Sequence, residues 1–287
     1  MNKIVALLAF KDNYIWAIHS LEGSEIVVID PGDAKPVLQY LKECKLTLSA
    51  ILITHHHWDH SGGILKLRQH FPDITVYGSK NEKINGVNHP VQEGDKISLP
   101  AFDLTMRVLD IPGHTLGHVA YVSDKPALLF CGDTLFSCGC GRVFEGTPEQ
   151  MVHSLNKLKQ LPPQTLMYCG HEYTLANIAF AQLIEPHNKM LMKRLDQVKE
   201  LRAQGLPSLP VTMAEEQQTN PFLRCDQPDV ITAAQNYRDT QDNSAQNYRD
   251  TQDKNPRQNY QDSHHSDPAH SDPITIFTLL RQWKNQL

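Results

Sequence analysis

The sequence HHHWDH, residues 55–60, follows directly on the apolar run SAILIT, residues 49–54. That run has the length and the aliphatic, β-branched composition of a buried strand, so the histidines begin where a strand ends. A helix over the same residues would pair His56 with His60 four positions apart, as in helical zinc proteases. However, no Glu stands beside the first His of that pair, and strand-forming residues lead into the motif. We therefore expect a metal-binding loop at the end of a strand.

The HxHxDH spacing suits two adjacent metal ions. On an extended backbone alternate side chains share a face, so His55 and His57 can bind one ion together. As the chain bends toward the glycines that follow, Asp59 and His60 can reach a second position close by.

The composition is that of an ordinary globular protein. The chain has 287 residues, of which 40% are hydrophobic, enough for one large domain or two moderate ones. The formal net charge of -5 and the pI of about 6.3 argue against a polyanionic partner. No apolar run approaches the roughly 20 residues that span a bilayer. We expect a monomer that binds neither nucleic acid nor a membrane.

The six cysteines are scattered without a CxxC pair, which is typical of reduced thiols. The apolar run at residues 4–10 is too short for a signal peptide, lacks a small-residue cleavage pattern and passes at once into KDNY. We interpret it as a first β-strand and expect a cytoplasmic protein.

Three further apolar segments end just before a residue type that binds metals: residues 104–111, 127–131 and 166–169, followed by His114, Asp133 and His171. A glycine beside each potential ligand lets the backbone turn sharply, and loops at strand ends commonly present functional side chains. Imidazole and carboxylate ligands together suit zinc, iron or manganese. We expect two divalent metal ions, with zinc preferred. The first is assigned to His55, His57 and His114, the second to Asp59, His60 and His171, and Asp133 bridges them.

Four motifs, HHHWDH, PGHTLGH, GDTLF and CGHEYT, resemble those of the metallo-β-lactamase superfamily, and specifically of its glyoxalase II, or hydroxyacylglutathione hydrolase, family. The resemblance extends to FKDNYIW at 10–16, IDPGD at 29–33, GCGRVFEGT at 139–147 and NPFLR at 220–224. It implies an α/β fold, an αββα sandwich with a two-metal site at one edge, followed by a small α-helical C-terminal domain. It also implies hydrolysis of S-(2-hydroxyacyl)glutathione, typically S-D-lactoylglutathione, to glutathione and D-lactate, the second step of methylglyoxal detoxification.

The residues fit thioester hydrolysis independently of the family. A thioester carbonyl needs a nucleophile at neutral pH and stabilisation of the oxyanion, and two metal ions that share a hydroxide can supply both. Asp59 and Asp133 are the expected catalytic carboxylates, because they help to hold that hydroxide. Asp30 and His118 are candidates to orient the ligating histidines.

We expect a catalytic domain at residues 1–172 and a helical substrate-binding domain at 173–287. Helices are predicted at 172–184 and 189–204, and capping boxes at Thr147 with Gln150 and at Thr212 with Glu215. The last helix begins at Asp272 and is expected to bury a stripe of Ile276, Leu279, Leu280, Trp283 and Leu287.

Arg281 and Lys284 share a different face of the last helix, and composition by itself indicates solvated charges there. The family, however, uses an Arg and a Lys at this spacing to hold the glycine carboxylate of glutathione. The resemblance further implies that Arg142, Phe144 and Tyr173 line the glutathione pocket. The family commonly has Lys in place of Arg142 and Tyr in place of Phe144, so this chain keeps the charge but lacks a hydroxyl group.

The nonapeptide AQNYRDTQD occurs at 234–242 and again, unchanged, at 245–253, a period of 11 residues. The surrounding segment has almost no aliphatic residues, so we predict a disordered insertion at about 232–271.

Other classes of protein fit the sequence less well. A persulfide dioxygenase needs one iron and would not be expected to retain His60, Asp133 and His171 as a second set. A β-lactamase or lactonase would lack the pair of Arg281 and Lys284. A nucleic-acid-processing enzyme would carry a basic clamp, and a non-catalytic binding protein would have lost a ligand.

Overall fold

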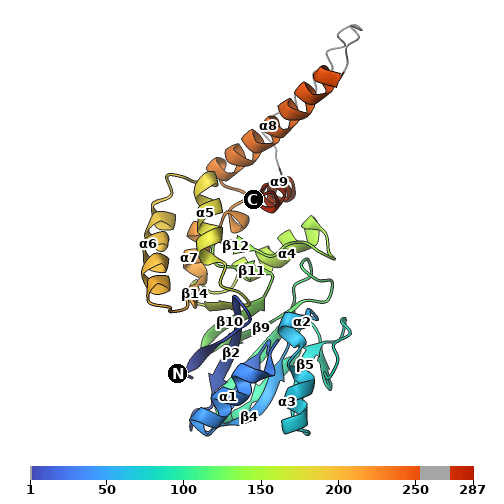
Figure 1. Ribbon diagram of the computed structural model, residues 1–287, viewed down its shortest axis with the longest axis vertical. Helices are drawn as coiled ribbons and strands as arrows, with labels where there is room; N and C mark the ends of the chain where they lie inside the picture. The colour runs from blue at the N-terminus through green and yellow to red at the C-terminus, as the bar shows by residue number, and fades with distance from the viewer. Residues whose placement is uncertain (1, 253–271) are drawn as a thin grey trace.

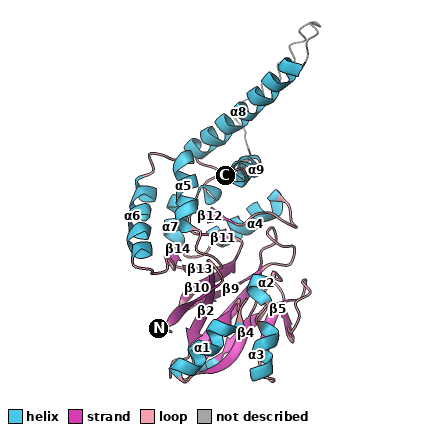
Figure 2. Ribbon diagram, in the orientation of Figure 1, coloured by secondary structure: helices cyan, strands magenta, loops and turns pink. Residues whose placement is uncertain are grey.

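Two six-stranded β-sheets lie face to face, and a group of helices packs at one end of them (Figures 1 and 2). The computed structural model describes residues 2–252 and 272–287, with the backbone path alone for 242–252. The first sheet has the order β1-β2-β3-β4-β5-β6. Its strands are β1 (Ile4–Ala9), β2 (Asn13–His19), β3 (Glu25–Ile29), β4 (Thr47–Leu52), β5 (Thr75–Ser79) and β6 (His89–Val91).

The second sheet has the order β14-β13-β10-β9-β8-β7. Its strands are β7 (Lys96–Leu99), β8 (Leu104–Asp110), β9 (Val119–Asp124), β10 (Ala127–Gly132), β13 (Leu166–Cys169) and β14 (Val211–Thr212). A short hairpin of β11 (Leu135–Phe136) and β12 (Gly139–Cys140) stands apart from both sheets. The predicted strands at residues 4–10, 49–54, 104–111, 127–131 and 166–169 correspond to β1, β4, β8, β10 and β13 within one or two residues.

Alternating side chains divide the core of the sandwich. In β4, Ala50 and Leu52 face the second sheet, whereas Ile51 belongs to the cluster beneath the outer helices. Those helices are α1 (Ala34–Cys44) and α3 (Ile64–His70). Because successive residues of a strand point to opposite faces, a strand must be apolar on both faces where both are covered, and Ala50, Ile51 and Leu52 of β4 are all apolar and buried.

The remaining helices are mostly C-terminal. They are α2 (Trp58–Ser61), α4 (Pro148–Lys159), α5 (Thr174–Ile184), α6 (Lys189–Ala203), α7 (Met213–Thr219), α8 (Pro228–Gln252) and α9 (Pro273–Asn285), with 3-10 turns η1 (Pro100–Phe102) and η2 (Pro221–Leu223). Both predicted capping boxes are present, at the starts of α4 and α7. Asp272 caps α9 as expected, and its carboxylate accepts from the backbone N–H groups of Ile274 and Thr275.

Two predictions about the C-terminal third are wrong. Residues 232–252, expected to be disordered, instead continue helix α8, which projects from the body of the molecule (Figure 1). The helix begins with a stripe that the prediction missed: Val230, Ala234 and Tyr237 recur at i, i+4 and i+7 and are buried. Leu287, expected in the buried stripe of the last helix, is 77% exposed because α9 ends before it. Phe277, which the predicted stripe did not include, is buried. The rest of the expected insertion, residues 253–271, lies outside the described residues.

In the described part of the chain, no helix combines the length and the apolar character needed to cross a bilayer.

Replacing Ile51 by Ala should lower the free energy of unfolding by about 2–5 kcal/mol, because the side chain is fully buried in the central strand β4. Urea denaturation of metal-free protein measures this without a contribution from metal binding. The exposed Thr47 on the same strand is the control, and Thr47→Ala should change the free energy by less than about 0.5 kcal/mol. Similar losses in both variants would contradict the assignment of Ile51 to the core.

Candidate metal centre

Metal-binding side chains from four strand ends meet at one edge of the sandwich. The loop after β4 carries residues 55–60, and β8, β10 and β13 lead into His114, Asp133 and His171. The residues expected to bind metal therefore lie together, as loops of a rigid sheet allow.

His55, His57 and His114 form the first cluster of donor atoms. Nδ1 of His57 lies 3.1 Å from Nε2 of His55 and 3.1 Å from Nε2 of His114. Nitrogens bound to one tetrahedral zinc at 2.0–2.1 Å would be about 3.3 Å apart, so these separations are close to those of ligands that share an ion. Burial lowers the pKa of all three imidazoles, which favours the neutral, metal-binding form.

Asp59, His60 and His171 form the second cluster. The Nε2 atoms of His60 and His171 are 3.2 Å apart, and Asp59 Oδ2 lies 3.5 Å from each. The Nδ2 group of Asn13 donates to Asp59 Oδ2 at 3.0 Å and orients the carboxylate. This set also matches the spacing of ligands around a single ion.

Asp133 lies between the two clusters. Its Oδ2 is 3.6 Å from Nε2 of His114 and 3.3 Å from Nε2 of His171, and its Oδ1 is 3.4 Å from Nε2 of His60. Burial alone would raise the pKa of Asp133, but His60 and His171 hold it well below its usual range. Oδ1 is buried and accepts no hydrogen bond from the described residues. A buried carboxylate with an unpaired oxygen requires positive charge, so the donor set fits divalent cations.

Three imidazole rings are turned toward the clusters by a hydrogen bond on the opposite nitrogen. Nδ1 of His114 donates to the Arg142 carbonyl at 2.8 Å. Nδ1 of His60 donates to Asp30 Oδ2 at 3.1 Å, and Nδ1 of His171 donates to Asp12 Oδ1 at 2.8 Å. Each bond directs Nε2 to the metal-binding side, as is usual for histidine ligands. The sequence interpretation named Asp30 but missed Asp12, although FKDNY, which contains it, was among the quoted motifs.

The other candidates are placed as follows. His118 Nε2 accepts from the backbone N–H of Asp133 at 3.1 Å, so it helps to hold Asp133 between the two clusters. His56 turns away and pairs with Glu145 at 2.7 Å, and the Trp58 side chain is exposed. Neither was expected to be a ligand.

Close approach of the backbone makes Gly170 necessary. A Cβ atom there would lie 2.4 Å from Asp133 Oδ1 and 2.6 Å from Cε1 of His60. Any side chain at this position would therefore displace Asp133 and His60.

A cavity of about 490 Å³ opens beside the clusters. It is lined by His114 and Asp133, by the five residues expected to bind substrate, Arg142, Phe144, Tyr173, Arg281 and Lys284, and by Phe136, Cys140, Gly141, Ala176 and Asn177. Three of these side chains are cationic. The composition-based expectation of solvated charges on the last helix was wrong for Arg281, which is 8% exposed and donates to the Cys140 carbonyl at 2.9 Å.

Comparison with known proteins connects this geometry to a family. Residues 12–171 match the metallo-beta-lactamase superfamily, and residues 172–287 match the hydroxyacylglutathione hydrolase C-terminus. A hydroxyacylglutathione hydrolase of Nitrosomonas eutropha is 47% identical over 285 residues, which cover 99% of each chain. The chain belongs to the hydroxyacylglutathione hydrolase family. The persulfide dioxygenase alternative is not favoured.

Solved structures from the same superfamily share the fold. The BLEG-1 B3 metallo-beta-lactamase has a TM-score of 0.58 and 25% identity, covering 78% of this chain and 99% of its own. TTHA1623 in a di-iron-bound form has a TM-score of 0.54 and 27% identity, covering 77% of this chain and 100% of its own. The predicted metallo-β-lactamase sandwich with C-terminal helices is confirmed.

Asp12→Asn should weaken metal binding about 10- to 100-fold at the second cluster, because His171 loses the carboxylate that orients its ring. Competition titration with a chromophoric chelator measures the affinity of each site. The exposed Asp73 provides the control variant Asp73→Asn, which should titrate like the unmodified protein. Unchanged affinity in Asp12→Asn would contradict the role of Asp12.

Proposed function

We propose that this protein hydrolyses S-(2-hydroxyacyl)glutathione thioesters, S-D-lactoylglutathione among them, to glutathione and the 2-hydroxy acid. The observation that carries the proposal is the 490 Å³ cavity, which is lined both by three cationic side chains and by His114 and Asp133. Glutathione brings two carboxylates and a thioester sulfur, so its conjugates need both cations and a hydrolytic centre. The family membership of the whole chain supports the same substrate class.

We infer that two divalent cations, with zinc preferred and iron or manganese able to replace it, occupy the two donor clusters. His55, His57 and His114 would hold one, Asp59, His60 and His171 the other, and Asp133 both. When bound, such cations polarise the thioester carbonyl and lower the pKa of water so that a nucleophile exists near neutral pH.

The protein's own groups supply the remaining steps. Water oxygen attacks the carbonyl carbon, the carbon–sulfur bond breaks, and the thiolate takes up a proton. Asp133 and Asp59 help to hold and orient the attacking water, and the proton that this water gives up passes to the departing thiolate. Burial of the imidazoles of His60, His114 and His171 keeps bulk water away from the carboxylate of Asp133.

The glutathione end of the substrate is held by the cations of the cavity. Arg281 and Lys284 attract the glycine carboxylate, and Arg142 adds a third positive charge near the sulfur. Tyr173 stacks on the His171 ring, with centroids 4.7 Å apart, and forms an aromatic wall beside the second cluster. Phe144 is 61% exposed and contributes apolar surface where the family commonly has a hydroxyl.

The proposal also covers the domain boundary, the cellular location and the oligomeric state of the protein. We place the boundary between the catalytic and the substrate-binding domain at residues 172 and 173, next to the junction of the two family matches. All six cysteines are free thiols, which supports a cytoplasmic location. We propose a monomer without a nucleic-acid or membrane partner that acts in the second step of methylglyoxal detoxification.

Hydrolysis of S-D-lactoylglutathione should exceed that of the lactoyl thioester of N-acetylcysteamine, which has the same acyl group but lacks both carboxylates. Arg142→Ala should raise KM for the glutathione thioester about tenfold, because a charged hydrogen bond is lost. Steady-state kinetics on both substrates measure these effects.

The exposed side chain of Arg142 can be removed without disturbing the core, and Arg107→Ala, distant from the cavity, is the control. Equal kcat/KM for the two thioesters in the unmodified protein would exclude glutathione recognition while leaving thioester hydrolysis intact.

The affinity for substrate should fall as the pH rises through about 8. Burial, and secondarily the neighbouring Arg281, lowers the pKa of Lys284 to about 8. Below that pH the ammonium attracts the substrate carboxylate, and above it the neutral amine does not, so kcat/KM should decline on the alkaline side. Lys284→Arg keeps its charge and should lose this decline, which pH profiles of both proteins test. Identical profiles would contradict the assignment of the decline to Lys284.

A further inference from the structure

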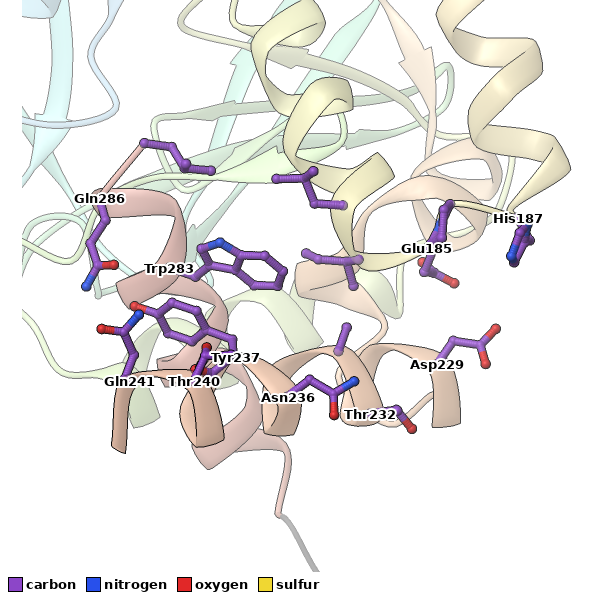
Figure 3. A pocket seen from close by; sticks show the side chains of 15 residues that line it. Glu185, His187, Asp229, Thr232, Asn236, Tyr237, Thr240, Gln241, Trp283 and Gln286 are labelled. Atoms are coloured by element: carbon purple, nitrogen blue, oxygen red, sulfur yellow. The ribbon is translucent and has the colours of Figure 1, made fainter. Parts of the chain in front are cut away.

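Helix α9 directs its cationic side chains into the substrate cavity and its Trp283 side chain toward α8. Arg281 and Lys284 line the substrate cavity, whereas Trp283 lies about 200° around the helix from Arg281. Figure 3 shows Trp283 against Tyr237, which comes from α8. The two rings are 5.0 Å apart between centroids and 5° from parallel, and Tyr237 is 8% exposed.

The cationic side of α9 rests on two aromatic rings. Arg281 lies over the Phe222 ring at 5.3 Å, and Lys284 Nζ lies 5.6 Å from the Phe180 centroid and 5.7 Å from that of Phe222. Lys284 also donates to the side-chain oxygen of Asn177. The positions of both cations therefore depend on how α9 is set against these rings.

Phe180 connects the two sides of the helix. Trp283 meets its ring edge-on, with centroids 5.6 Å apart, while Lys284 Nζ lies over the same ring. Tyr237, Trp283 and Phe180 thus form a continuous row of contacts that ends at Lys284. A shift of Trp283 would turn α9 and move the ammonium group with it.

Space for such a shift is present. A cavity of about 740 Å³ borders both Tyr237 and Trp283, and its other walls come from the end of α5 and the loop after it, from α8 and from the residues that follow α9 (Figure 3). With open volume on that side, the stacked ring of Tyr237 limits how far Trp283 can move outward.

We propose that Tyr237, in the first copy of the repeated AQNYRDTQD sequence, is a positioning residue for glutathione recognition, holding α9 through Trp283 so that Arg281 and Lys284 face the substrate carboxylate. This rests on the proposed function. It assigns a role to a segment whose composition suggested only disorder. Tyr237 does not line the substrate cavity, so it acts on the two cations only indirectly, through Trp283 of α9 and Phe180 of α5.

The test compares Tyr237→Ala and Tyr237→Phe with the unmodified protein. Tyr237→Ala should raise KM for S-D-lactoylglutathione about 3- to 10-fold, in line with the strength of an aromatic pair, and change kcat less than about twofold. Its KM for the lactoyl thioester of N-acetylcysteamine should not change. Tyr237→Phe keeps the stacked ring and should restore the KM of the unmodified protein. Calorimetric titration with glutathione itself should show the same loss of affinity without turnover.

Asn236→Ala is the matched control, because Asn236 is exposed and borders the same 740 Å³ cavity. An unchanged KM in Tyr237→Ala, or equal increases for both thioesters, would overturn the proposal. A failure of the proposed function would differ, because the unmodified protein itself would then show no preference for the glutathione thioester.

Discussion

The buried carboxylate of Asp133 is the constraint on which the site depends. It lies between two groups of imidazoles, and one of its oxygens has no hydrogen-bond partner among the described residues. Removing a carboxylate from water is costly unless positive charge compensates it. The surrounding sandwich must therefore hold the neighbouring donors at fixed positions. Strand ends do this because the sheets behind them are packed on both faces.

The segment at residues 139–142 connects this centre to the helices. Within residues 139–142, the carbonyl of Arg142 accepts from the ring of His114, and that of Cys140 accepts from Arg281. Asn220, in the NPFLR motif, donates to the Gly139 carbonyl from the C-terminal side. His114 of the first donor cluster and Arg281 of the cavity are thus held by neighbouring peptide groups, which fixes their separation.

Much of this arrangement could be predicted because it depends on local patterns. Apolar runs followed by glycine and a donor marked three strand ends, and the HHHWDH motif marked a fourth. Thr147 and Thr212 marked helix starts through their capping boxes. Asp12 escaped prediction because its partner, His171, is 159 residues away and nothing in the local sequence connects them. The helix after residue 232 was missed because its buried residues Val230, Ala234 and Tyr237 form a weak hydrophobic stripe in a polar segment.

The sequence by itself determined the types of metal donor and their order along the chain, since these follow from motifs a few residues long. Tertiary structure alone decided that Arg281 is buried rather than solvated, that Asp12 orients His171, and that Tyr237 supports Trp283. The physical reason is the range of the interactions. Capping and strand periodicity act between near neighbours, whereas burial, charge compensation and ring stacking depend on segments that only the folded chain brings together.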